Sequence, residues 1–257
     1  MTRGLYTSAS GMLALQVALD ATANNLANVA TVGYKQDRAV YHDFRDLLIS
    51  RLYDTPEGPV PPVPWGTPPI GRLGTGVYVE DIATDFTAQG PLQQTGGDLD
   101  VALVGSGFLV VRTPSGERYT RAGQLVRDAQ GFLVNDDGHL VLGENGPIRL
   151  AADTPTSEIR IAENGEVFER DQRIGRLRIE DLLPGAVKEG YTLVRGTSTG
   201  QASGSTVVKQ GYLEGSAVNG IRETVELIQI ERAYQAGQRS IEAVDDSLGR
   251  LFEKVAG

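Results

Sequence analysis

The stretch that decides the fold is residues 219–255, NGIRETVELIQIERAYQAGQRSIEAVDDSLGRLFEKV. From Leu227 onward, apolar residues recur at alternating steps of three and four, with one interruption at Gly237. The members of this stripe are Leu227, Ile230, Tyr234, Ile241, Val244, Leu248, Leu251 and Val255. Such spacing keeps side chains on one side of an α-helix, so it predicts a long helix whose stripe is buried against another helix. At about 1.5 Å per residue the helix would be roughly 55 Å long, more than the rest of a small domain covers.

Residues 4–30 repeat the same rhythm and predict a partner helix. The residues on its stripe are Leu5, Ser8, Met12, Leu15, Leu19, Thr22, Leu26 and Val29. Alanines at many other positions would let neighbouring helices approach closely. Two interpretations remain open: a helical hairpin within one chain, or helices from several chains forming a common layer. The position of the two stripes at opposite ends of the chain favours assembly.

Three asparagines, Asn24, Asn25 and Asn28, lie late in this helix, before Gly33. Asparagine is a mediocre helix former and a good terminator, so they could mark a frayed helix end. Alternatively they hydrogen-bond across a helix interface and set its register, as a single asparagine does in coiled coils.

Composition excludes several classes of protein. The 257-residue chain has 24 basic and 33 acidic residues, a net charge of −9 that disfavours binding to nucleic-acid phosphates. It has no cysteine, which excludes disulfides and thiolate chemistry. No run of apolar residues is long enough for a membrane span, and the first residues lack the apolar core of a cleaved signal peptide.

The middle of the chain changes character twice. Most of the twelve prolines fall between residues 53 and 76, a segment expected to be neither helix nor central strand. Residues 77–195 alternate short apolar runs with turn clusters at 114–117, 135–138 and 163–166, which predict antiparallel hairpins. We expect an exposed loop at 196–206. The sequence therefore predicts an α+β fold: long N- and C-terminal α-helices pair as a coiled-coil-like layer, with a central antiparallel β-rich domain inserted between them.

Signals of catalysis are weak. Residues 196–200, GTSTG, match a nucleophile elbow around Ser198, but the residues that follow do not suit a helix start. The two histidines, His42 and His139, are isolated, and His139 fits an exposed turn. Asp98 and Asp100 alternate on a possible strand edge, where turn and edge solubilisation explains them better than acid–base chemistry. We expect no catalytic residue, no metal and no cofactor. A hydrolase that uses Ser198 stays as the enzymatic alternative.

Several motifs closely resemble those of bacterial flagellar rod and hook proteins. They are ANNLANVATVGYK at 23–35, GPLQQTGGDLDVAL at 90–103, YTRAG at 119–123, QGYLEGSAVN at 210–219 and ERAYQA at 231–236. They span nearly the whole chain in the family's order. Departures are Ala30, Gly220 and the proline-rich residues 56–69, which we expect to stiffen the packing between neighbouring subunits.

The resemblance implies a structural subunit of the basal-body rod of the proximal or distal type, in which terminal helices form an inner tube. The implied segments are the N-terminal helix (1–32), an extended proline-rich connector (33–76), the β domain (77–199), a returning connector (200–218) and the C-terminal helix (219–257). A hook-type subunit and a secreted coiled-coil binding module are the alternatives.

The assembly contacts are expected from both stripes and the asparagines. These residues are Leu5, Met12, Leu15, Leu19, Asn24, Asn25, Leu26, Asn28, Val29, Leu227, Ile230, Tyr234, Ile241, Val244, Leu248 and Leu251. The implied partners are further copies of the chain, other rod proteins, hook protein, the rod cap, surrounding ring proteins and the flagellar export apparatus, with no nucleic acid or small-molecule substrate. The implied location is the periplasm-spanning rod, reached by export without a cleaved signal peptide.

Overall fold

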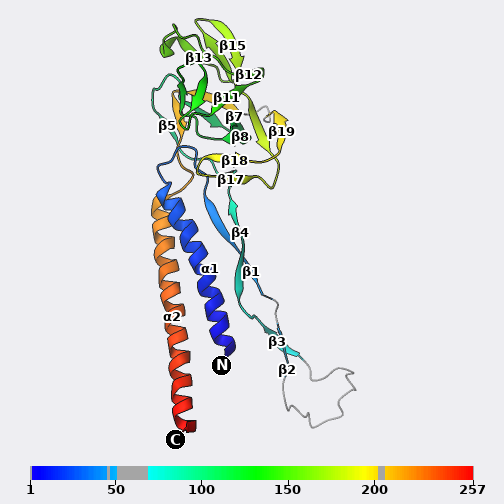
Figure 1. Cartoon of the computed structure of the whole chain (residues 1–257), viewed down its shortest axis with the longest axis vertical. Coiled ribbons are helices and arrows are strands. Elements are labelled where there is room, and N and C mark those ends of the chain that lie inside the picture. Colours follow the sequence, from blue (N-terminus) through cyan, green and yellow to red (C-terminus); the bar gives the residue numbers. More distant parts are fainter. Residues whose placement is uncertain (1, 45–46, 51–68, 202–205, 257) are drawn as a thin grey trace, which may run out of the picture. The chain divides into compact units, whose positions relative to one another are not determined.

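The computed structural model describes residues 2–44, 47–50, 69–201 and 206–256. The chain divides into two compact units, each built from segments far apart in sequence (Figure 1). The first unit comprises Met1–Ala23, Arg38–Ala83 and Val225–Gly257, and the second comprises Asn24–Asp37 and Thr84–Thr224. The five segments inferred from the sequence stay a prediction. Trp65 and most of the proline-rich segment lie outside the described residues.

Along the sequence, the strands lie between two long helices, as the α+β prediction requires. The helices are α1 (Thr2–Ala27) and α2 (Gly220–Ala256), with a short 3-10 turn η1 (Thr156–Glu158). The strands are β1 (Asp37–Asp43), β2 (Leu47–Ser50), β3 (Pro69–Leu73), β4 (Val77–Thr84), β5 (Leu92–Gln94), β6 (Val101–Val104), β7 (Phe108–Thr113), β8 (Gly116–Thr120), β9 (Leu125–Arg127), β10 (Leu133–Asn135), β11 (Leu140–Gly143), β12 (Gly146–Pro147), β13 (Ile159–Ile161), β14 (Glu166–Glu169), β15 (Gln172–Arg176), β16 (Ile179–Leu182), β17 (Val187–Glu189), β18 (Leu193–Arg195), β19 (Ser198–Gln201), β20 (Val207–Gln210) and β21 (Tyr212–Glu214).

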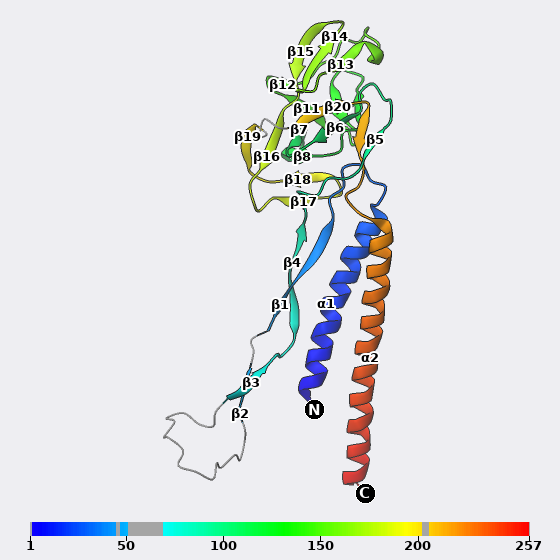
Figure 2. The same cartoon turned by 180° about the vertical axis from the view of Figure 1, so that it is seen from behind.

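In the first unit α1 and α2 run antiparallel side by side (Figures 1 and 2). Gly237, the break in the predicted stripe of α2, lies at Met12 of α1, where an added Cβ would be 2.8 Å from the Met12 Cγ. The missing side chain therefore lets the two helices approach. This unit also contains the paired strands β1 and β4 and the antiparallel pair β2 and β3.

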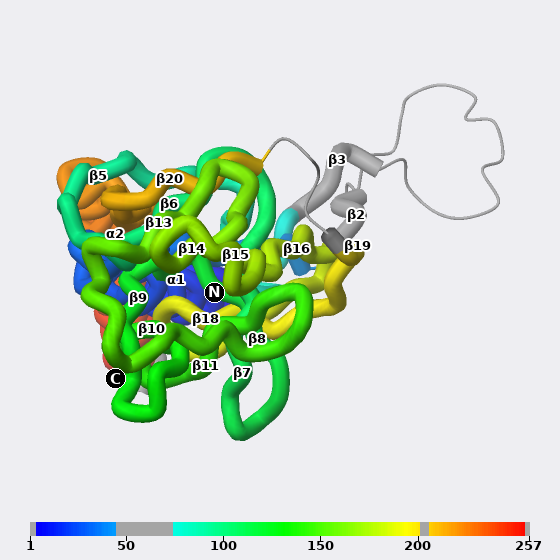
Figure 3. The backbone as a smooth tube through the Cα atoms, turned by 90° about the horizontal axis from the view of Figure 1, so that it is seen from above, coloured from blue at the N-terminus to red at the C-terminus, as the bar shows by residue number. Residues whose placement is uncertain are grey.

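The second unit is an antiparallel β body, which confirms the predicted pairing (Figure 3). Its main sheet has the order β17-β18-β8-β7-β11-β10-β9, and β13-β14-β15 form a smaller sheet. The three predicted turns join β7 to β8, β10 to β11 and β13 to β14. Aliphatic side chains from both sheets and from the β6–β20 pair fill one core, in which Val101, Val111 and Val167 have no exposed surface.

Three expectations about the limits or placement of elements were wrong. Helix α1 ends at Ala27, not at residue 30. The Asn28 side chain caps this end, because its Nδ2 donates to the Asn24 carbonyl oxygen at 2.9 Å. The expected loop at 196–206 contains strand β19, which pairs with β16. Asp98 and Asp100 lie in the turn before β6, not on a strand edge. The proline-rich segment was expected to contain no central strand, and this holds for its described end: Pro69 begins β3, which pairs with β2 in a two-stranded sheet, a position where proline's missing amide proton is tolerated.

The turn between β14 and β15 is strained, and we predict that glycine relieves it. Arg170 and Asp171, the two residues between paired Glu169 and Gln172, have φ of 48° and 69°. Non-glycine residues are disfavoured there, and Asn-Gly is the preferred pair for such a hairpin. Asp171→Gly is therefore expected to raise the free energy of unfolding by about 0.5–1 kcal/mol, measured by urea denaturation. Gly165→Ala, at φ 83° in a neighbouring turn, should move stability in the opposite direction. A lower free energy of unfolding for Asp171→Gly would contradict the claim that this turn is strained.

Candidate assembly site

The predicted stripe of α2 corresponds to the least exposed side of that helix. From Leu227 to Leu248 the predicted members are half-buried or buried, whereas most residues between them are exposed. Ile230 is the most covered, at 8% exposed, and Leu251 near the end is 47% exposed. A single chain therefore covers the first part of the stripe better than the last part.

On α1 the most buried apolar residues are not the predicted stripe. Ala14, Ala18 and Ala21 are buried, because a methyl group is fully covered where neighbouring backbone comes close. The predicted residues Leu5, Met12, Leu15, Leu19 and Leu26 are only half-buried, and Asn24 and Val29 are exposed. The leucine stripe thus keeps apolar surface available for further contacts.

A buried carboxylate, Glu214 at the end of β21, holds the residues that follow α1 against the β body. Glu214 has no exposed surface and accepts hydrogen bonds from Lys35 Nζ at 2.8 Å and Arg121 Nη1 at 3.0 Å. The backbone N–H of Gly90 donates to the same carboxylate at 3.2 Å. Burial lowers the pKa of the Lys35 ammonium and the Glu214 charge opposes that shift. Buried ions of this kind are tolerated only with such pairing.

Gly33 is required beside this ion cluster. Its φ is +68°, and an added Cβ would lie 2.5 Å from backbone atoms of Arg121 and Ala122. Its own N–H donates to the Glu214 carbonyl oxygen at 2.8 Å. Glu214 therefore fixes this turn through both its side chain and its backbone.

A second polar cluster joins the end of α1 to the start of α2. Asn25, 1% exposed, donates from Nδ2 to the Asp37 carbonyl oxygen at 2.8 Å and to the Glu223 carboxylate at 3.1 Å. Gln36 donates to the other Glu223 oxygen at 2.7 Å. Asn28 instead bonds within its own turn, to Asn24 and Thr31. Asn25 therefore bonds from α1 to α2 within one chain, whereas Asn28 closes the turn after α1. Whether the asparagines also set the register between chains stays a prediction.

Tyr34 and Lys188 complete the second cluster. The Tyr34 hydroxyl lies 2.8 Å from Asn24 Oδ1 and 3.2 Å from Asn25 Oδ1. Lys188 Nζ lies 3.8 Å from the centre of the Tyr34 ring and donates to Asp37 Oδ2 at 2.8 Å. Burial, with the Asp37 carboxylate adding to it, raises the pKa of the Tyr34 phenol well above its usual value. Burial lowers the pKa of the Lys188 ammonium.

The apolar stripes do not predict this polar junction, which we define as the two clusters around Glu214 and Glu223. Lys35, Arg121 and Glu214 all belong to motifs that carry the family resemblance. The sequence signal for the buried ion cluster was the presence of a charged residue inside an otherwise apolar motif. No sequence rule would have paired Lys35 with a carboxylate 179 residues away.

The weak catalytic candidates are separated from one another. Ser198 starts strand β19, and its Oγ accepts the Gly200 N–H at 2.9 Å, so it does not sit on a strand–helix elbow. His42 Nε2 lies 2.8 Å from Glu80 on the neighbouring strand. Within the described residues no group of three histidine or acidic side chains is placed to hold a metal ion. None of the helices described has the length and apolar character needed to cross a membrane.

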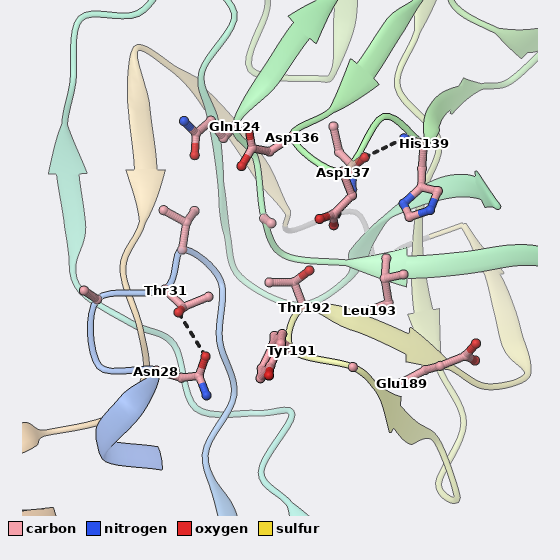
Figure 4. Close-up of a pocket in the computed structure, with 15 residues that line it drawn as sticks. Asn28, Thr31, Gln124, Asp136, Asp137, His139, Glu189, Tyr191, Thr192 and Leu193 are labelled. Atoms are coloured by element: carbon pink, nitrogen blue, oxygen red, sulfur yellow. Dashed lines mark hydrogen bonds between the residues drawn. The ribbon is translucent and has the colours of Figure 1, made fainter. Parts of the chain in front are cut away.

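A pocket of about 560 Å³ lies in the β body (Figure 4). One wall is the turn after α1, with Asn28 and Thr31; facing it are the β10–β11 turn, with Asp136, Asp137 and His139, and the β17–β18 turn, with Tyr191. His139 is half-buried, not the freely exposed turn residue expected from the sequence, and its Nδ1 is buried without a hydrogen-bond partner among the described residues.

Three family models match successive parts of the chain. "Flagella basal body rod protein" matches residues 5–35, "Flagellar hook protein FlgE/F/G D1 domain" matches 102–169, and "Flagellar basal body rod FlgEFG protein C-terminal" matches 209–253. The first match contains most of α1 and Lys35, the second contains Arg121, and the third contains Glu214 and most of α2.

Similar proteins align over almost the entire chain. The flagellar basal-body rod protein FlgF of Caulobacter vibrioides is 33% identical, over 92% of this chain and 91% of its own length. FlgG of Agrobacterium fabrum is 33% identical, over 95% of this chain and 96% of its own. FlgG of Bacillus subtilis is 32% identical, over 98% of each chain.

Removing the charge of Glu214 should destabilise the protein strongly. In Glu214→Gln the shape is kept, but Lys35 and Arg121 become buried cations without a counter-charge, which costs about 3–5 kcal/mol. The free energy of unfolding from urea titration measures this loss. The matched control is Glu158→Gln, which breaks an exposed ion pair with Arg170 and should cost at most about 1 kcal/mol. Equal losses in the two variants would contradict a special role for Glu214.

The raised pKa of Tyr34 predicts how stability depends on pH. The unfolded chain ionises this phenol near its ordinary pKa of 10.0, whereas the folded chain keeps the proton. The free energy of unfolding contributed by Tyr34 is therefore complete below pH 10 and falls as pH rises above it. Tyr34→Phe should be less stable than the parent by about 1–3 kcal/mol at neutral pH. That gap should narrow by up to about 1.4 kcal/mol per pH unit in alkaline solution. If the free energies of unfolding of the two proteins change in parallel between pH 8 and 11, the pKa of Tyr34 is not raised in the folded protein.

Proposed function

The chain belongs to the family of flagellar basal-body rod proteins and is a structural subunit of the rod, and on this premise we propose that it polymerises through the stripes of α1 and α2. The observation that supports this mode of assembly is the incomplete cover of those stripes. The leucines of α1 are half-buried, and the α2 stripe ends with Leu251 47% exposed. Apolar stripes that one chain leaves partly in water are stabilised when other helices cover them.

The proposed contacts comprise the apolar positions named from the sequence on both helices and Val29 in the turn after α1. Val29 and Leu251, the most exposed of them, have the largest apolar area to gain from a neighbouring copy. Asn24, Asn25 and Asn28 stay among the proposed assembly residues. The side chains of Asn25 and Asn28 are engaged inside the chain, so we propose that these two shape the contact surface by fixing the end of α1.

The protein locates to the flagellar basal body and assembles with other rod and hook components, as its family does. We further propose that the rod it builds spans the periplasm and carries torque to the hook. The proposed partners include the rod cap, the ring proteins around the rod and the flagellar export apparatus, which would pass the chain without a cleaved signal peptide. Relatives named FlgF and FlgG are equally similar at 33% identity, so both the proximal and the distal rod type are consistent with the sequence.

The role we propose is mechanical and not catalytic. Its support is the separation of Ser198, His42 and His139 on different elements, each with neighbours that suit structure and not a reacting group. A hook-type subunit is the second candidate, because the family model matching residues 102–169 is shared with hook protein FlgE.

A charge placed in the α2 stripe should block assembly. Leu248→Glu puts a carboxylate on the half-buried side of α2, so its burial in a polymer would require desolvation of the charge. We expect the concentration needed for self-association to rise at least about tenfold, equivalent to about 1.4 kcal/mol, as measured by sedimentation of the full chain.

The matched control lies one residue away. Ser247→Glu adds the same charge to the exposed side of the same helix turn and should assemble like the parent. Unimpaired assembly of Leu248→Glu would contradict the proposed contact, as would equal impairment of both variants.

A further inference from the structure

The pocket of the β body has the chemistry of a receptor for a basic side chain. Fifteen residues line it, and they include Asp136, Asp137 and Glu189 but no lysine or arginine. Arg118 Nε donates to Glu189 at 2.7 Å, so that carboxylate is already paired. The uncompensated negative charge is that of Asp136 and Asp137, which are exposed at the pocket edge.

Hydrogen bonds from Asn135 hold the turn that carries the two aspartates. Asn135, at its start, accepts the His139 N–H through Oδ1 at 2.7 Å and donates from Nδ2 to Asp137 Oδ2 at 3.3 Å. Asp136 forms no hydrogen bond within the described part of the chain. A carboxylate presented in a fixed position loses little entropy when it binds a cation.

The rest of the pocket suits the same kind of ligand. The ring of Tyr191, 64% exposed, lies between the aspartate turn and the Asn28–Thr31 turn (Figure 4). An aromatic face beside carboxylates attracts guanidinium and ammonium groups through cation–π and charge-assisted contacts.

The chain itself carries a matching surface. Arg232, Arg239 and Arg250 on α2 are seven and eleven residues apart, close to whole turns, so they form one row along the helix. Arg232 is nine residues from Ile241, roughly 180° around the helix, so the row faces away from the stripe. All three are exposed, and among the described residues none has an ion pair.

We propose that this pocket receives an arginine from the α2 row of a second copy of the chain. The inference rests on the proposed polymerisation, and it assigns to the copies a second, charged contact besides the apolar stripes. Charge complementarity selects the occupant: the pocket lacks a cation, and the exposed arginines lack an anion, in a protein whose net charge of −9 would otherwise oppose association.

Cysteine cross-linking tests the contact directly, since the chain contains no cysteine of its own. Gln124→Cys places a thiol in an exposed position of the pocket, and Ala236→Cys places one in the arginine row. The two full-length variants are mixed under assembly conditions and oxidised. We expect a disulfide-linked dimer of the two variants. The control Gln130→Cys, on a different exposed turn of the body, should cross-link to Ala236→Cys at least about tenfold less. An equal yield with the control, or no cross-link at all, overturns the proposal.

Charge reversal provides the second measurement. Asp136→Lys with Asp137→Lys changes two exposed side chains of this turn and should reduce the cross-link at least about tenfold. When the pocket carries the two lysines, changing the row arginine that enters the pocket to glutamate should restore the cross-link. Sedimentation of the same samples distinguishes the arginine contact from the proposed polymerisation. Polymers that form without the cross-link overturn the arginine contact and leave the proposed function intact. A parent chain that never self-associates overturns both.

Discussion

The structure of the second unit depends on one buried carboxylate. Glu214 comes from the strand that precedes α2, yet its partners Lys35 and Arg121 come from the residues after α1 and from the middle of the body. Three segments that are remote in sequence thus meet at a group with no exposed surface. An unpaired charge in such a place is costly, so the network is stable only when every segment is present and correctly placed.

The same principle explains why the ends of both helices belong to the β body and not to the helical unit. Asn25 near the end of α1 and Glu223 in the first turn of α2 share a buried hydrogen bond. Beyond these anchored ends the helices carry apolar stripes that one chain covers incompletely. The protein therefore combines a tightly specified junction with helices whose remaining surface is suited to neighbours, which is the division expected of a subunit in a polymer.

Sequence periodicity predicted α2 and its buried side well, because a three-and-four repeat over so many residues has one physical explanation. The antiparallel hairpins were also predictable, since Asn–Gly and Asp–Gly turns have few alternatives. On α1 the leucine stripe does not mark the side that is covered within one chain, because Ala14, Ala18 and Ala21 are the most buried apolar residues there. Periodicity could not find the junction, because pairing Lys35 with Glu214 is decided by tertiary structure and not by spacing. The pocket was equally hidden, as it is formed by three separate turns.

The central claim is that the helix stripes remain under-covered in one chain and gain their cover from other copies. Amide hydrogen exchange along α2, compared between dilute monomer and polymer, tests it most directly. The account predicts that amides after Tyr234 exchange at least about tenfold more slowly in the polymer, while the Gly33 amide, bonded to Glu214 in the junction, is protected in both states. Equal protection of the α2 amides in monomer and polymer would contradict it.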